Sequence, residues 1–136
     1  MPDHLNQVTL DTLIQQGATS CHFKENQIIL YGEHLPAGIY IITSGDIIVY
    51  SASRGIKKKG SEMRLNCDRH FIILPSIEYL NRKSLIQAMA ISNCKALFVP
   101  KSIVQNNKSI SVYFNRSEPD RTAKYVSSIK IMYPSF

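Results

Sequence analysis

The stretch that decides the fold is GIYIITSGDIIVY, residues 38–50. Two runs rich in β-branched and aromatic residues, 39–43 and 47–50, flank a short polar segment that contains Gly45. Such side chains favour extended backbone, and a glycine between two such runs is typical of a tight hairpin turn. This stretch therefore predicts two antiparallel strands joined by a turn at Gly45.

Similar apolar runs recur along the chain on both sides of this hairpin. We expect further strands over residues 28–31, 63–67, 71–74, 85–90 and 95–99. Many short strands with turns at steady intervals predict an all-β fold, an antiparallel β-roll or jelly roll, rather than alternating strands and helices. A short helix is predicted within residues 5–17, and Pro100 is well placed to open another after the last strand.

The C-terminal part has an apolar spacing that suggests a helix. Pro119 and two acidic residues favour a helix start, and apolar residues then recur every three or four positions at Ala123, Val126, Ile129 and Met132. We expect one domain over residues 1–136, with a helix and the roll over about 9–100 and C-terminal helices over about 101–133. The apolar stripe either forms a homodimer interface or packs back onto its own roll.

Composition and charge limit the possible functions. The chain has 136 residues, 44% of them hydrophobic and 19% charged, which is an ordinary globular composition. No apolar run is long enough to span a membrane and the N-terminus does not resemble a signal peptide, so we expect a cytoplasmic protein. The net charge of +6 is uneven: residues 1–50 hold one base and five acids, and residues 51–136 hold fifteen bases and five acids.

The basic half could attract an acidic partner. Three consecutive lysines, Lys57, Lys58 and Lys59, lie in a glycine-bounded segment that we expect to be a hairpin tip. Such a tip either contacts a partner or only keeps a sheet edge soluble. Because residues 1–136 leave no room for a helix-turn-helix, we expect only weak, salt-sensitive contact with DNA and no sequence-specific binding by this chain alone.

No catalytic or metal-binding pattern is apparent. Cys21, Cys67 and Cys94 form no CxxC pair, so they fit small core hydrophobes better than a disulfide or zinc site. The four histidines are scattered, and no nucleophile elbow or phosphate-binding loop is present. We expect no catalytic residues, no metal and no cofactor, and therefore no enzyme.

The order of elements resembles the cyclic-nucleotide-binding domain of the CRP/FNR regulators and the protein-kinase-A regulatory subunit. The similarity is carried by residues 23–33 and 38–50, in which Gly32 and Gly45 match turn glycines of the family and Tyr40 leads a buried strand. A second match covers residues 90–100, similar to the strand that closes the family's roll. The resemblance extends over about residues 9–130 and implies a sensory β-roll.

The resemblance also implies where a cyclic nucleotide would bind. The family holds it with a Gly-Glu pair, followed about eleven residues later by an arginine and then a serine or threonine. Counting back from Ala90 places Ile73 and Leu74 at the Gly-Glu pair, and Ser84 and Leu85 at the Arg-Ser pair. No position keeps the family's residue, although Arg82 and Lys83 lie close enough to offer a cation if the register is shifted.

These observations predict a regulatory or protein-interaction module that has lost cAMP and cGMP binding. One alternative is a sensor for a different small ligand, held in a more apolar cavity near Ile73, Leu74 and Leu85. A second alternative is that the chain is the N-terminal sensory part of a longer transcription regulator. A protein partner or a homodimer through the C-terminal helix is expected in the first case.

Overall fold

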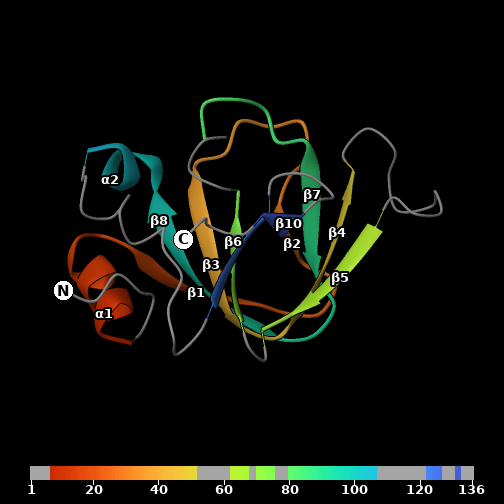
Figure 1. Cartoon of the computed structure of the whole chain (residues 1–136), viewed down its shortest axis with the longest axis horizontal. Coiled ribbons are helices and arrows are strands. Elements are labelled where there is room, and N and C mark those ends of the chain that lie inside the picture. Colours follow the sequence, from red (N-terminus) through yellow and green to blue (C-terminus); the bar gives the residue numbers. More distant parts are fainter. Residues whose placement is uncertain are drawn as a thin grey trace.

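The computed structural model describes residues 7–51, 62–67, 70–75, 80–106, 122–126 and 131–132. In this part of the chain two short helices accompany ten strands (Figure 1). The helices are α1 (Gln7–Gln15) and α2 (Lys101–Asn106). The strands are β1 (Thr19–Phe23), β2 (Ile28–Leu30), β3 (Gly38–Ser44), β4 (Asp46–Ser51), β5 (Glu62–Asn66), β6 (His70–Leu74), β7 (Ile86–Ala90), β8 (Cys94–Pro100), β9 (Thr122–Val126) and β10 (Ile131–Met132). The predicted all-β roll with short helices is confirmed.

The strands form two sheets that face each other. One sheet has the order β1-β8-β3-β6-β9-β10 and the other has the order β2-β7-β4-β5. Their pairings are antiparallel, except that β6 and β9 run parallel. The hairpin predicted from the central stretch joins the two sheets, because β3 pairs in the first sheet and β4 in the second.

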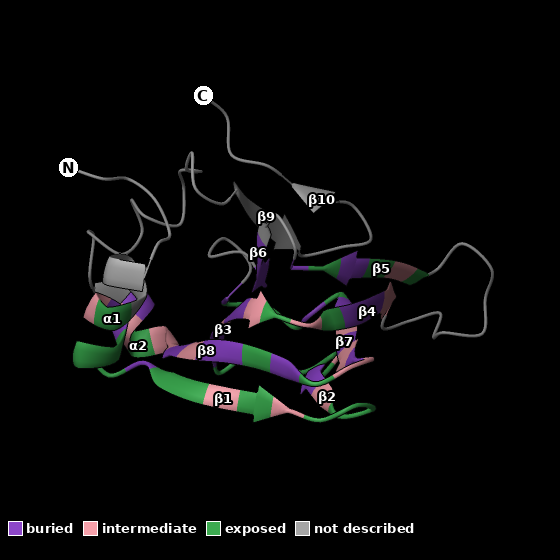
Figure 2. Ribbon diagram, turned by 90° about the horizontal axis from the view of Figure 1, so that it is seen from below, coloured by how far each residue is buried: buried purple, intermediate pink, exposed green. Residues whose placement is uncertain are grey.

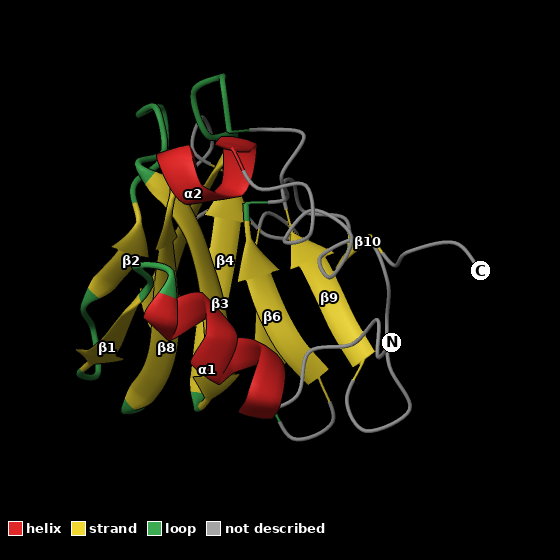
Figure 3. Cartoon of the chain, turned by 90° about the vertical axis from the view of Figure 1, so that its left-hand side faces the viewer, coloured by secondary structure: helices red, strands yellow, loops and turns green. Residues whose placement is uncertain are grey.

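Strand alternation divides the core between two layers. Ile41 on β3 packs toward the helices, and the next residue, Ile42, packs between the two sheets. Figure 3 shows α1 and α2 lying over the face of the sheet that contains β8, β3 and β6. Leu13 of α1 and Val104 of α2 are each 1% exposed there and cover the sheet's outer apolar side chains.

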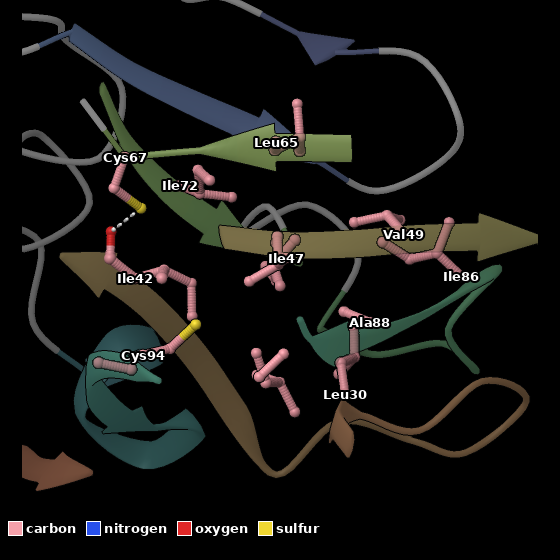
Figure 4. Close-up of a cluster of buried hydrophobic side chains, with 14 residues drawn as sticks. Leu30, Ile42, Ile47, Val49, Leu65, Cys67, Ile72, Ile86, Ala88 and Cys94 are labelled. Atoms are coloured by element: carbon pink, nitrogen blue, oxygen red, sulfur yellow. Dashed lines mark hydrogen bonds between the residues drawn. The ribbon is translucent and has the colours of Figure 1, made fainter. Parts of the chain in front are cut away.

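The core between the sheets is lined with aliphatic side chains and small cysteines (Figure 4). Its buried members are Ile29, Leu30, Ile42, Ile47, Val49, Leu65, Cys67, Ile72, Leu74, Ile86, Ala88, Ala90, Cys94 and Ala96. Most of these point inward because successive side chains on a strand alternate between its two faces, and the irregular pairing of β2 near Ile28 and Leu30 lets the adjacent Ile29 and Leu30 both pack in this cluster. This packing leaves the residues at the two ends of the roll as the candidates for binding.

Gly45 makes the β3–β4 turn possible. Its backbone has φ of 103°, a left-handed conformation that residues with a side chain rarely adopt. A Cβ atom built there would lie 2.6 Å from both the Asn93 carbonyl oxygen and the Cys94 Sγ. The glycine predicted at this turn therefore has two roles, in backbone conformation and in close approach to the β7–β8 turn.

The C-terminal helix predicted from residues 118–133 is wrong over the residues that the structure describes. Ala123 and Val126 lie in β9, which pairs with β6, and Met132 lies in β10, which pairs with β9. Residues 122–126 include threonine, tyrosine and valine, which favour strands, and the edge of β6 offers backbone hydrogen bonds that outweigh a weak helical periodicity. The proposed dimer helix does not exist there; Ile129 lies outside the described residues.

Candidate binding sites at the two ends of the roll

Two loops meet at one end of the roll, which we call the loop end. It carries residues 31–37, between β2 and β3, and residues 80–85, before β7 (Figure 1). The Glu33 N–H donates to the Ser84 carbonyl and the Ser84 N–H donates to the His34 carbonyl, both at 2.9 Å. These reciprocal bonds hold the two loops together, as two residues of an antiparallel ladder would be held.

Ser84 is a structural residue in this junction. It is 6% exposed, and its Oγ donates to the Ile86 carbonyl at 2.7 Å and accepts from the Ile86 N–H at 3.2 Å. Both interactions lie within its own segment and shape the entry into β7. The hydroxyl therefore makes these hydrogen bonds within the turn and stabilises the loop end.

An open pocket of about 370 Å³ lies at the loop end. Its lining includes Leu30, Tyr31, His34, Leu35, Pro36 and Tyr40. Tyr31 and His34 make an edge contact with ring centroids 6.0 Å apart, and the Tyr40 ring lies 4.9 Å from that of Phe98. Burial raises the pKa of the Tyr40 phenol, so that its hydroxyl stays protonated. The pocket is predominantly apolar, with tyrosine and histidine as its polar groups.

Three large apolar side chains are exposed around the loop end. Tyr31 and Leu35 are each 57% exposed and Leu85 is 55% exposed. We call these three residues the loop-end patch. The burial of their neighbours Leu30 and Ile86 shows that exposure is confined to the loops and does not extend into the strands.

The opposite end, which we call the turn end, carries a second pocket of about 390 Å³. It lies where the end of β1 meets the β3–β4 and β7–β8 turns, and its lining includes His22, Phe23, Lys24, Ser44, Asn93 and Lys95. This pocket was not predicted from the sequence. Its basic residues come from strands that are distant in the chain, so only the strand pairing brings them together.

Comparison with known proteins extends the description of the fold. No family model and no curated protein matches this sequence. Among solved structures, the regulatory domain of Toxoplasma gondii protein kinase A with cAMP matches over 79% of this chain and 40% of its own, at 16% identity and a TM-score of 0.55. A cyclic-nucleotide-binding-like protein from Brucella abortus matches over 72% of this chain and 81% of its own, at 15% identity and a TM-score of 0.54. The chain has the cyclic-nucleotide-binding fold.

A bacterial protein from Ruegeria pomeroyi also shares this cyclic-nucleotide-binding fold, with a TM-score of 0.52 and 14% identity. The match covers 82% of the present chain but only 52% of the Ruegeria protein. The present chain thus spans about half the length of that relative. These likenesses confirm the fold expected from residues 23–50 and 90–100.

The positions where this fold's Gly-Glu pair was expected are occupied by core residues. Ile73 and Leu74 are both 0% exposed, but Ile73 packs on the helix side of β6 and Leu74 packs between the sheets. Leu85 is exposed. Ile73 and Leu74 therefore point to opposite faces of β6, because adjacent strand residues alternate, and Leu85 points away from the core. A ligand cavity near these three residues stays a prediction.

The cationic residues near these positions lie on the surface. Arg82 and Lys83 are both exposed and directly precede the buried Ser84. The structure therefore places two cations at the loop end. Whether either of them meets an anion stays a prediction.

The cysteines behave as small core residues. None of the three forms a disulfide, and Cys67 donates from Sγ to the Ile42 carbonyl at 3.4 Å (Figure 4). Cys94 donates to the Asp46 carbonyl at 3.3 Å, and burial raises the pKa of its thiol. Within the described ranges, no three histidine, cysteine or acidic side chains gather in a way that could hold a metal ion.

Several other predicted features lie outside the described residues. These include the basic tip of Lys57, Lys58 and Lys59 and the segment that contains Ile129. Neither helix of the described chain has the length and apolar character needed to cross a membrane. The basic tip therefore stays a prediction from the sequence.

Proposed function

We propose that this chain is a non-enzymatic regulatory module that binds a protein partner through the loop end of its roll and does not bind cAMP or cGMP. The observation that carries the proposal is the loop-end patch: Tyr31, Leu35 and Leu85 are each more than half exposed on two loops that are hydrogen-bonded to each other. Large exposed apolar side chains at one end of a domain commonly mark an interaction surface.

The absence of the cyclic-nucleotide residues supports the first part of the proposal. A cyclic phosphate needs a positive partner and backbone donors when it leaves water, because an unpaired buried charge is costly. At the expected positions the side chains of Ile73 and Leu74 fill the core, and the Ser84 hydroxyl bonds the backbone of Ile86. The arginine and the glutamate that the resemblance implies are both missing there.

The rigidity of the loop end supports the second part. The reciprocal bonds between residues 33–34 and Ser84 fix one loop against the other, so that Leu35 and Leu85 are presented on a preformed surface. A preformed surface loses less conformational entropy on binding than a mobile one. Tyrosine is also among the residues that contribute most to binding energy in protein interfaces.

Paired variants test this proposal. Leu35→Glu with Leu85→Glu would place charge on the loop-end patch, and Ile14→Glu, at a side chain that is 43% exposed on α1, is the control. Proteins captured from cells that express the chain would be quantified for wild type and both variants, followed by binding assays with the purified candidate. We expect a partner that the control retains and the double variant loses.

The result that contradicts the proposal is capture of the same proteins by all three forms. Sedimentation velocity at about 50 μM provides a second readout. If the wild type is a dimer and Leu35→Glu with Leu85→Glu dissociates it, the partner is a second copy of this chain and not a different protein. Thermal unfolding of each variant verifies that the double variant is folded.

A second candidate function rests on the loop-end pocket. A cavity of about 370 Å³ beside Tyr31 and Tyr40 is large enough for a small apolar or aromatic ligand. In that case the chain would be a sensor for a molecule other than a cyclic nucleotide. Titration with indole, followed by amide chemical shifts, would show perturbation confined to residues 29–40 if this pocket binds small aromatic molecules.

A further inference from the structure

We propose that the turn-end pocket is a binding site for a small organic phosphate, held by Lys24, Lys95 and His22. This site lies at the end of the roll opposite the loop-end patch and is independent of the proposed protein contact. The pocket measures about 390 Å³, within the range of pockets that hold small molecules. Its chemistry follows from which side chains the strand pairing brings to its rim.

The strand register brings the basic residues together. His22 on β1 pairs directly with Lys95 on β8, and the adjacent pair is Phe23 with Cys94. Lys24 directly follows β1 and lines the same pocket. Because residues paired across two strands share a face of the sheet, the His22 and Lys95 side chains lie on one face at the end of β1. Figure 2 shows this edge strand, β1, largely exposed to solvent.

Two turns fix the rest of the rim. The Lys24 N–H donates to Gln27 Oε1 at 2.7 Å, and the Gln27 N–H donates back to the Lys24 carbonyl at 3.0 Å. On the other side Gly45 allows the β3–β4 turn to approach Asn93 closely, which brings Ser44 and Asn93 into the lining. The polar groups are therefore held on a tight, preformed framework, which favours binding.

The residues that line the pocket include two lysines and no acidic residue. Within residues 7–51 and 80–106, which contain its whole lining, the side chains of His22, Lys24 and Lys95 have no hydrogen-bond or ion-pair partner. The lining does not include Glu25, which directly follows Lys24, or Asp46, whose carboxylate lies close enough to act electrostatically on the Cys94 thiol. Two ammonium groups without partners at the rim of one concave site attract an anion, and a dianion satisfies both.

The floor of the pocket adds an apolar contact. Phe23 is half-buried and its ring makes an edge contact with Tyr40 at 5.9 Å, while Cys94 is buried beside it. Phe23 and Cys94 point toward the core between the sheets, whereas His22 and Lys95 lie on the other face. A ligand at the open end of β1 would therefore meet the lysines with its phosphate and the exposed part of Phe23 with an apolar or aromatic body. Ser44 and Asn93 supply hydroxyl and amide donors at the same rim. The chemical class that fits is therefore a phosphomonoester of a small apolar or aromatic group.

Three probes separate the contributions of charge and apolar contact. Phenyl phosphate carries both features, inorganic phosphate carries the charge alone, and phenol carries the ring alone. We expect phenyl phosphate to bind most tightly and phenol not to bind. Amide shifts in the ¹⁵N-labelled chain should be largest at Phe23, Lys24, Asn93 and Lys95.

Charge-matched variants test the assignment. Losing one charged contact weakens binding about tenfold, so Lys24→Gln with Lys95→Gln should weaken phenyl phosphate binding by about a hundredfold. Lys83→Gln, an exposed lysine at the loop end, removes a charge away from the pocket and should change the affinity less than about twofold.

Equal affinities of the wild type and the Lys24→Gln with Lys95→Gln variant for phenyl phosphate would overturn the proposal. Amide shifts concentrated at the loop end would also overturn it. Binding of single-stranded oligonucleotides that depends on Lys24 and Lys95, without binding of phenyl phosphate, would also overturn it and would assign this surface to nucleic acid. None of these outcomes depends on whether the loop-end patch binds a protein.

Discussion

Glu33 and Ser84, on loops far apart in the sequence, are joined backbone to backbone: the Glu33 N–H donates to the Ser84 carbonyl at 2.9 Å. Glu33 has φ of 62°, a left-handed conformation uncommon for a residue with a side chain. The bond to Ser84 supports this conformation. The segment before β7, where the resemblance places a phosphate-binding arginine and serine, is thus used here to hold the roll's two loops in register.

Ser84→Ala should destabilise the fold without any change in ligand binding. The substitution removes the hydroxyl that bonds both the N–H and the carbonyl of Ile86, and leaves those buried groups less satisfied. We expect a loss of about 1 to 2 kcal/mol in the free energy of unfolding. Ser20→Ala, at an exposed position on β1, is the control. Urea denaturation that gives equal stabilities for the two variants would contradict this role of Ser84.

Leu74→Ala and Leu85→Ala make the same chemical change at a buried and an exposed site. Leu74 is 0% exposed between the sheets, so its truncation should cost about 2 to 5 kcal/mol. Leu85 is 55% exposed, and its truncation should change stability by less than about 0.5 kcal/mol. Chemical denaturation of both variants measures the difference. Similar losses would show that Leu85 belongs to the core.

Gly45→Ala should destabilise the chain strongly. The added Cβ would meet the Asn93 carbonyl oxygen and Cys94 Sγ at 2.6 Å, and the backbone would keep φ of 103°. Left-handed strain and overpacking together predict a loss of at least about 2 kcal/mol. Ser44→Ala, at the adjacent exposed position, should be nearly neutral by comparison. Thermal unfolding of both variants tests this difference, and equal melting temperatures would contradict it.

The fold should lose stability in alkaline solution. Burial raises the pKa of the Cys21 and Cys94 thiols above the ordinary value of about 9.0, and that of the Tyr40 phenol above about 10.0. The folded state therefore binds these protons more tightly than the unfolded chain does. Their contribution to stability is constant below pH 9 and is lost as pH rises through the raised values. Urea unfolding at several pH values measures this loss of stability. An increase in the free energy of unfolding above pH 9 would contradict the prediction.

The strands were predictable where they are apolar and separated by clear turns. The β3–β4 hairpin follows from its β-branched runs and Gly45, and in the structure Ile41 and Ile42 pack on opposite faces of β3. Strand β1 was not predicted because about half of its residues, TSCHF, are polar. Such a sequence suits an edge strand in which only Cys21 and Phe23 point inward. In that case the local pattern is too weak to identify the strand.

The C-terminal segment and the turn-end pocket required tertiary information. Ala123 and Val126 fit a helical spacing, and the pairing with β6 adds to the strand preference of the neighbouring threonine, tyrosine and valine. Lys24 and Lys95 are separated by most of the chain, and the pairing of β1 with β8 brings them to one pocket. Likewise, only the strand pairing shows that Ile73 and Leu74 lie on opposite faces of β6.

The most direct measurement is calorimetric titration of the chain with cAMP and with cGMP, repeated on Arg82→Ala. Loss of the arginine and the glutamate that the resemblance implies should weaken binding by at least about a hundredfold, so we predict no binding in the micromolar range by either form. A dissociation constant below about 10 μM for either nucleotide would contradict this prediction, and its loss in Arg82→Ala would show that Arg82 supplies the phosphate contact from a shifted position.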